Sequence, residues 1–284
     1  MNLVVGVLLS TPTTKFQCAC NGFFDIINRM KNRKIIIGNW KMNPLAPKEA
    51  EKLFNKIAKS ISRIKKTEII ICPPFVYLER LKKISKKIKL GAQNAFVGDV
   101  GAFTGEVSGE MLYNLGVRYV ILGHSERRAR GETGGEINKK IKSALSASLT
   151  PILCVGENSR DDNHEYFNIV KSQMLECLDG IRKNTISKII FAYEPVWAIS
   201  STPGRRDAMP EDAREMAVFI RKTISDITGP QVANQAGVIY GGSVTEKDVG
   251  DFLQSGGVDG VLVGKASLNV EKFVKIINVA ENIS

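Results

Sequence analysis

Short apolar runs alternate with amphipathic segments along the chain from Lys34 to the C-terminus. Each run is followed by a loop and then by a segment in which apolar residues recur at the spacing of one helix face. A run that is apolar throughout is typical of a strand buried on both faces, as in a parallel sheet. The predicted strands are residues 35–40, 69–72, 89–93, 119–122, 151–155, 189–193, 237–240 and 261–263.

The segments between these runs have the features of helices. Ala50, Phe54 and Ile57 fall on one helix face, and Pro47 and Pro210 stand where the first residue of a helix is expected. The alternation of eight strands with eight helices contains no domain-sized insertion and no low-complexity linker. This pattern favours a closed α/β barrel of the (βα)8 type, with eight parallel strands surrounded by helices, over an open doubly wound sheet.

The composition narrows the class of protein. The 284 residues are 43% hydrophobic and 24% charged, which suits one large core. No apolar run approaches the roughly 20 residues that a membrane span needs, so we expect no membrane partner. The five cysteines are odd in number and lack a Cys-x-x-Cys pair, and the chain has only two histidines. Neither a zinc site nor a disulfide framework is therefore expected, and a reducing cytoplasm fits best.

The net charge of +11 bears on possible partners. Lysines gather on helical faces, for example Lys82, Lys83, Lys86 and Lys87, without exposed aromatic residues between them and without a nucleic-acid-binding motif. The first interpretation is a solvated lysine-rich surface. The second is a phosphorylated metabolite that the positive field steers to a cleft. Nucleic acid comes last, and we expect none as a partner.

Polar side chains suited to acid–base chemistry stand where several predicted strands end. Glu194 follows the sixth run, and Pro195 after it favours an extended Glu194 whose carboxylate faces the mouth of the barrel. Asn39 and Lys41 end the first run and, being two residues apart, are expected on the same side of that strand. His124 follows the fourth run. A carboxylate and an imidazole on one rim are the pair that acid–base catalysis requires.

The last two strands are followed by loops suited to binding an anion. Residues 240–244 read YGGSV, and residues 264–267 read GKAS. Glycines there let backbone N–H groups approach a phosphate at a helix start, which is a frequent arrangement in this fold. A nucleotide-binding P-loop is excluded, because Asp259 stands where its first glycine is required and Ala266 replaces its magnesium-binding hydroxyl.

Seven motifs occur together in an order and spacing that closely resemble the triosephosphate isomerase family. They are GNWKMN, AQNAFVGDVGAFTGE, GHSERR, PILCVGE, YEPVWAI, YGGSV and DGVLVGKASL. The resemblance extends from about Lys34 to the C-terminus. It implies a TIM-barrel isomerase that interconverts dihydroxyacetone phosphate and glyceraldehyde 3-phosphate through an enediolate. That reaction belongs to glycolysis and gluconeogenesis and needs no metal or organic cofactor.

The resemblance also implies catalytic roles for four residues. Glu194 would be the base that moves the proton between neighbouring carbons. His124 would be a neutral electrophile, because N–H groups of the short helix after it donate to one ring nitrogen, a case for which this family is itself the established example. Lys41 and Asn39 would stabilise the developing oxyanion.

Three further residues are expected beside the catalytic ones. By the resemblance, Glu126 would hold Lys41 in place, and Ser125 would lie next to His124. Cys154 ends the fifth run and matches a family cysteine packed near the base. We interpret it as structural rather than nucleophilic, because no His or Lys adjoins it in the sequence to activate it.

The resemblance places the phosphate among main-chain donors. Backbone N–H groups of Ser243, Gly264 and Lys265, and of Ser200 in the loop after Glu194, would bind it. Binding energy from this remote group would close the loop as a lid and exclude water from the reaction.

Two departures from the usual family pattern affect this site. The lid, Ser200 to Met209, is longer than in the family, and Ser200 replaces a glycine. Lys265 replaces a second glycine. Its ammonium either adds a charge near the phosphate or points to solvent, and both alternatives stay open.

The segment Ala102 to Glu106 resembles the family loop that reaches into a partner subunit and braces Asn39 and Lys41. A homodimer is therefore expected. Two other functions are weighed against the isomerase. One is a barrel that binds phosphorylated metabolites without turnover, which only the altered lid supports. The other is nucleic-acid binding, which would have to survive physiological salt.

Residues 1–29 do not fit the barrel pattern. The apolar residues 3–9 have no basic residue before them and no clean cleavage site after them, so a signal peptide is not favoured. Met30 would serve as a natural chain start. We expect 1–29 to be an N-terminal extension, either disordered or the product of a misplaced start codon, and 30–284 to form a single catalytic barrel domain.

Deleting residues 1–29 tests this division of the chain. The shortened protein should keep its melting temperature and its isomerase activity, because the barrel pattern begins after the deletion. Calorimetry and a coupled isomerase assay on both forms would show this. An unfolded or inactive product would reject the expectation.

Overall fold

The computed structural model describes residues 33–199, 202 and 204–284. The predicted N-terminal extension, 1–29, lies outside the described residues. So does Ser200 of the predicted phosphate site.

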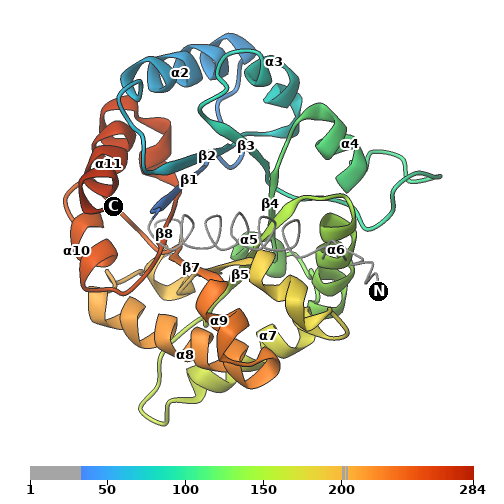
Figure 1. Ribbon diagram of the computed structural model, residues 1–284, viewed down its shortest axis with the longest axis vertical. Coiled ribbons are helices and arrows are strands. Elements are labelled where there is room, and N and C mark those ends of the chain that lie inside the picture. Colours follow the sequence, from blue (N-terminus) through green and yellow to red (C-terminus); the bar gives the residue numbers. More distant parts are fainter. Residues whose placement is uncertain (1–32, 200–201, 203) are drawn as a thin grey trace, which may run out of the picture. The chain divides into compact units, whose positions relative to one another are not determined.

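Eight parallel strands close into a barrel in chain order, with β8 paired to β1 (Figure 1). The strands are β1 Ile35–Asn39, β2 Glu68–Cys72, β3 Lys89–Ala92, β4 Tyr119–Leu122, β5 Thr150–Val155, β6 Ile190–Tyr193, β7 Gly237–Tyr240 and β8 Gly260–Val263. The predicted (βα)8 fold is confirmed. The first strand ends before its apolar run does, because the chain leaves the sheet at Lys41, whose φ of 52° is left-handed.

Helices surround the barrel on its outside (Figure 1). They are α2 Pro47–Ser60, α3 Leu78–Lys82, α4 Gly109–Leu115, α5 Ser125–Arg128, α6 Gly134–Ser146, α7 Glu165–Leu178, α8 Pro210–Thr228, α9 Pro230–Gln235, α10 Val249–Gln254 and α11 Val270–Ile283. Short 3-10 helices are η1 Phe75–Tyr77, η2 Lys183–Lys188, η3 Val196–Ala198 and η4 Lys265–Leu268. Helices α2 and α8 begin at Pro47 and Pro210 as predicted, since proline lacks the N–H that the first helical turn leaves unpaired.

The strands are buried on both faces, which explains their continuous apolar sequence. In β1, Ile35 and Ile37 point into the barrel, whereas Ile36 packs against the surrounding helices. The interior layer is completed by Ile70, Cys72, Ile121, Ile152, Cys154, Ile190, Ala192, Ile239 and Leu262. Because successive side chains of a strand point to opposite faces, every strand except β3 contributes to both layers. The barrel is thus a packed core, and function is left to its ends.

All eight strands run in the same direction, so their carboxyl ends meet at one end of the barrel. The loops that follow the strands bring residues distant in the sequence together there. None of the helices among the described residues has both the length and the apolarity to cross a membrane.

Candidate active site

A cavity of about 590 Å³ lies among the loops that follow the strands. It brings together these predicted residues: Asn39, Lys41, His124, Glu194, Ser243, Gly264 and Lys265. Ser125 and Cys154 line a smaller cavity of about 260 Å³ that also reaches Glu194. Glu126 contacts Lys41. The cavity lining also includes Arg205, Asn269 and Lys272, to which the sequence analysis gave no role.

The carboxylate of Glu194 is held by two donors. The residue directly follows β6 and is only 2% exposed. Its Oε1 lies 3.2 Å from Nε2 of His124, and its Oε2 accepts a hydrogen bond of 3.1 Å from the backbone N–H of Ser125. Burying a carboxylate is costly unless hydrogen bonds replace its lost water. These two donors meet that requirement in the unliganded site.

His124 is the N-cap residue of α5, and this position determines which of its ring nitrogens carries the proton. The backbone N–H of Glu126 donates to Nδ1 at 3.2 Å. A ring nitrogen that accepts a hydrogen bond carries no proton, so this contact assigns the imidazole proton to Nε2. The Nε2–H group therefore points at Glu194, and it can equally donate to a carbonyl oxygen placed there.

Lys41 is fixed at its amide, its carbonyl and its ammonium. Its N–H donates to Asn39 Oδ1 at 3.0 Å, and its carbonyl accepts from Gln93 Nε2 at 2.8 Å. Its Nζ lies 2.6 Å from Glu126. Strand alternation, the reason given for placing Asn39 and Lys41 on one side, is wrong, because Lys41 lies beyond the end of β1 in a left-handed conformation. The hydrogen bonds of its amide, carbonyl and ammonium orient Lys41 instead.

Gln93 is a residue that the sequence analysis missed. It sat at the end of an apolar run and was read as part of the strand, but β3 ends at Ala92. Its side-chain amide also donates to the carbonyl of Cys72 at 2.8 Å, so it ties the ends of β1 and β2 together. The signal in the sequence that could have singled out Gln93 is its position as a polar residue at the end of a mostly apolar run.

Glu126 stays ionised beside Lys41. Partial burial opposes ionisation, but the hydrogen bond and charge of the Lys41 ammonium outweigh it and hold the pKa of Glu126 below its usual value. The ion pair keeps the ammonium within the cavity lining rather than in free solution.

Cys154 is buried at the end of β5 next to Glu194. Burial, followed by the charge of Glu194, raises the pKa of the Cys154 thiol well above its usual value. Because the thiolate is the nucleophilic form, this environment supports the structural interpretation of Cys154.

Two glycines allow the chain to pass close to Glu194. A Cβ on Gly241 would lie 2.8 Å from Cγ of Glu194, and a Cβ on Gly156 would lie 2.0 Å from its backbone oxygen. Any side chain at these positions would displace the base. The sequence analysis assigned Gly241 only to the anion loop and gave Gly156 no role.

The lining of the same cavity contains Ser243, Gly264 and Lys265. Gly264 is the N-cap residue of η4, whose first residue is Lys265, so the chain turns into a helical segment there. The N–H of Ser243 donates to the carbonyl of Ala198 at 3.0 Å. That donor is therefore occupied by the segment after Glu194 and becomes available to an anion only when the segment moves.

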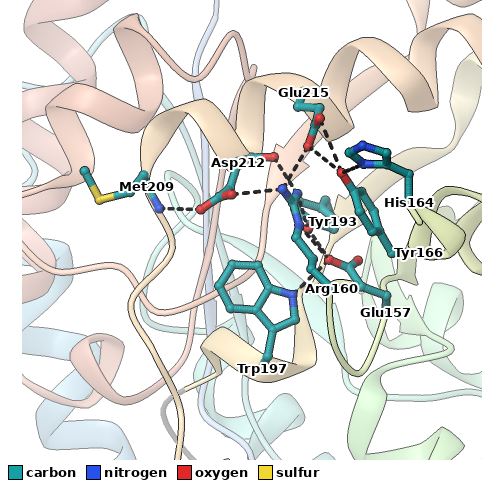
Figure 2. Close-up of polar contacts among 9 residues, drawn as sticks. All are labelled: Glu157, Arg160, His164, Tyr166, Tyr193, Trp197, Met209, Asp212 and Glu215. Atoms are coloured by element: carbon teal, nitrogen blue, oxygen red, sulfur yellow. Dashed lines mark hydrogen bonds and ion pairs between the residues drawn. The ribbon is translucent and has the colours of Figure 1, made fainter. Parts of the chain in front are cut away.

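Together with η3, which precedes it, the predicted lid forms the segment 196–209, called the lid from this point. Glu157 lies beside Trp197 at the start of this segment (Figure 2). Trp197 Nε1 donates to Glu157 Oε1 at 2.9 Å, and the hydroxyl of Tyr193 donates to the same oxygen at 2.7 Å. The N–H of Val196 donates to the Glu157 carbonyl at 2.9 Å. The sequence analysis gave Glu157 no role, although it closes the motif PILCVGE.

The described part of the longer lid folds back on its own start. The N–H of Arg206 donates to the carbonyl of Trp197 at 3.1 Å, and the Arg206 guanidinium lies 4.3 Å from the centre of the Trp197 ring. Thr202 Oγ1 donates to the carbonyl of Val196 at 2.6 Å. Thr202 and Arg206 therefore pack against η3.

The site as a whole is suited to moving a proton next to a carbonyl group. Glu194 is a buried carboxylate on the wall of the cavity, and His124 offers an N–H donor beside it. Lys41 supplies a fixed positive charge on the same cavity wall. A base, a hydrogen-bond donor and a cation stabilise the charge that develops on a carbonyl oxygen when a neighbouring carbon loses a proton. Among the described residues, no group of three or more His, Cys, Asp or Glu side chains is arranged to hold a metal ion.

Comparison with known proteins places the chain in a family. The family model for triosephosphate isomerase matches residues 34–280. A triosephosphate isomerase of Caldanaerobacter subterraneus subsp. tengcongensis is 43% identical over 250 residues, covering 87% of this chain and 99% of its own. One of Dehalococcoides mccartyi is 45% identical over 246 residues, covering 85% and 94%. One of Dictyoglomus thermophilum is 43% identical over 249 residues, covering 86% and 98%. The chain therefore belongs to the triosephosphate isomerase family.

Proposed function

We propose that Glu194 and His124 carry out the isomerisation of triose phosphates in this protein. The reaction interconverts dihydroxyacetone phosphate and glyceraldehyde 3-phosphate. The observation that supports these roles most directly is the 3.2 Å contact between Glu194 Oε1 and His124 Nε2, on the wall of a cavity that also includes Lys41.

The proton transfer follows from this geometry. Substrate entering the cavity takes the place of the carboxylate as the acceptor for His124 Nε2–H. Glu194 removes a proton from the carbon next to the carbonyl, and the electron pair moves into the developing enediolate. Nε2–H and the Lys41 ammonium stabilise the oxygen that becomes negative, while Asn39 holds the Lys41 backbone. Glu194 then returns the proton to the neighbouring carbon.

His124 also moves a proton between the two enediolate oxygens. Its Nε2 donates to one oxygen and can recover a proton from the other, while Nδ1 continues to accept from the Glu126 N–H. An imidazolium would stabilise one oxygen too strongly for this exchange, and a ring whose Nδ1 is an acceptor avoids that state.

The phosphate is bound in this cavity by Ser243, Gly264 and Lys265, together with Ser200 of the lid. When the lid closes over the phosphate, Ala198 must release the N–H of Ser243, which it occupies in this structure. Lid closure is thus coupled to phosphate binding through a single donor. Excluding water in this way strengthens the interactions with the enediolate.

We also propose a homodimer formed through the loop Ala102 to Glu106. This loop is exposed and projects from the barrel beside α4 (Figure 1). Phe103 is 48% exposed and packs only partly on Phe96, with 4.6 Å between the ring centres. Large apolar side chains on the preceding loops, Met42 and Val76, are 88% and 76% exposed. Several large apolar side chains exposed to solvent indicate a surface that a second subunit covers.

Replacing Glu194 by Gln should lower kcat by roughly 10² to 10⁴-fold, because the amide cannot accept the proton. A modest fall in melting temperature is expected, since Gln keeps an oxygen for only one of the two donors, His124 and the N–H of Ser125. A coupled assay starting from glyceraldehyde 3-phosphate measures this, with Glu79→Gln, an exposed site far from the cavity, as the control. Absence of turnover in the unmodified protein would instead favour the non-catalytic metabolite-binding barrel.

Replacing Lys265 by Gly distinguishes the two placements of its ammonium. If the ammonium acts on the phosphate, the inhibition constant for inorganic phosphate should rise about two- to threefold at low ionic strength, and less at high salt, because screening weakens an exposed charge. Lys86→Gly removes an equal charge from an exposed bend away from the cavity and serves as the control. An unchanged constant at low salt would place the ammonium in solvent.

Replacing Phe103 by Ser tests the dimer. Losing a buried phenyl ring from each subunit should raise the dimer dissociation constant by at least about tenfold. Sedimentation equilibrium measures this, and activity per subunit should fall on dilution. Val218→Ser, an exposed apolar residue on α8, is the matched control. Equal association of both variants would argue against this loop as the interface.

A further inference from the structure

Arg160, in the loop between β5 and α7, connects the two ends of the lid (Figure 2). Its side chain is only 11% exposed. The guanidinium donates to Glu157 and Tyr193 on one side, and to Asp212 and Glu215 of α8 on the other. The catalytic scheme above leaves this cluster without a role.

The first side of the cluster holds the segment around the catalytic base. Arg160 Nε lies 3.3 Å from Glu157 Oε1, the same oxygen that accepts from Trp197 and Tyr193. Burial, followed by the charge of Glu157, raises the pKa of Tyr193 well above its usual value, so its hydroxyl keeps the proton that it donates. Tyr193 immediately precedes Glu194. The cluster therefore holds the chain on both sides of the base.

The second side of the cluster holds the end of the lid. Asp212 Oδ2 accepts from the N–H of Met209, the last lid residue, at 2.8 Å. Asp212 Oδ1 lies 2.9 Å from Arg160 Nη1, and Arg160 Nη2 also donates to the Asp212 carbonyl at 3.1 Å. An unbroken series of hydrogen bonds thus runs from Trp197 through Glu157, Arg160 and Asp212 to Met209.

The chemistry of the guanidinium suits this connection. Its planar fork presents several donors at fixed angles, which an ammonium cannot reproduce. The central guanidinium carbon, Cζ of Arg160, lies 4.7 Å from the centre of the Tyr166 ring and 5.6 Å from that of the Trp197 ring, so the cation lies over both aromatic rings. Glu157 is fully buried, so the charge-assisted bonds to it act in a medium of low polarity and are strengthened there.

We propose that Arg160 is a positioning residue of the isomerase, which fixes the two anchors of the lid relative to each other through Glu157 and Asp212. This inference rests on the proposed roles of Glu194 and the lid. With both ends held, closing over the phosphate does not have to order the two anchors. If one anchor is loosened, closure has to order that anchor as well, and binding of the phosphate weakens.

Asp212→Asn is the variant that tests this, because Arg160 cannot be removed without leaving Glu157 buried and unpaired. Asparagine can still accept from the N–H of Met209, so the start of α8 is retained while the ion pair to Arg160 is lost. Glu215→Gln is the matched control. It removes another carboxylate, 2.8 Å from the same guanidinium and on the same helix, that has no bond to the lid.

The kinetic outcome separates positioning from stability. In the full-length enzyme, Asp212→Asn should raise KM and the inhibition constant for inorganic phosphate about tenfold, and change kcat less than about threefold. Glu215→Gln should change each by less than about twofold. Equal effects of the two variants, or a lower melting temperature with unchanged KM, would overturn the proposal.

The indole N–H signals provide a readout that does not depend on turnover. The chain has two tryptophans, so two such signals are expected in NMR spectra. Asp212→Asn should add microsecond-to-millisecond exchange broadening to the signal of Trp197 but not to that of Trp40. An unchanged Trp197 signal would contradict the connection. An inactive wild-type enzyme would refute the proposed function alone, since this measurement still tests the cluster.

Discussion

The structure depends on keeping the carboxylate of Glu194 buried and correctly aimed. Such a group is unfavourable inside a protein unless donors replace the water around it. Here the donors are His124 and the backbone of Ser125, which become available because β4 ends where α5 begins. Gly241 and Gly156 leave room for the base. A closed parallel barrel meets these demands together, since it brings the ends of β4, β6 and β7 to one place.

Two nearby carboxylates have opposite uses because their partners differ. Glu157 accepts from Tyr193, Trp197 and Arg160, all belonging to the chain, so it serves to hold the structure. Glu194 accepts one donor at each carboxylate oxygen, from His124 and from the backbone of Ser125, on the wall of the cavity. Glu157 instead gathers three side chains at one oxygen and so keeps the segment around the base in register.

The lid shows how a departure from the family pattern is accommodated. Its additional length could have enlarged the number of states that closure must select from, at an entropic cost. In the described residues, Arg206 packs on Trp197, and Thr202 bonds to Val196, so this part of the lid folds against η3. Trp197 and Met209, at its two ends, are both bonded to the cluster around Arg160.

The sequence by itself determined the strand order, the starts of α2 and α8, and several residues of the cavity wall, because apolar runs, helix-starting prolines and strand-end polar residues are local signals. It did not reveal why Lys41 faces the cavity, nor the parts played by Gln93, Glu157 and Arg160. Those depend on hydrogen bonds between loops far apart in the chain. A local pattern records which face of an element is buried. Only the closed barrel decides which loop ends meet, and therefore which donor each acceptor finds.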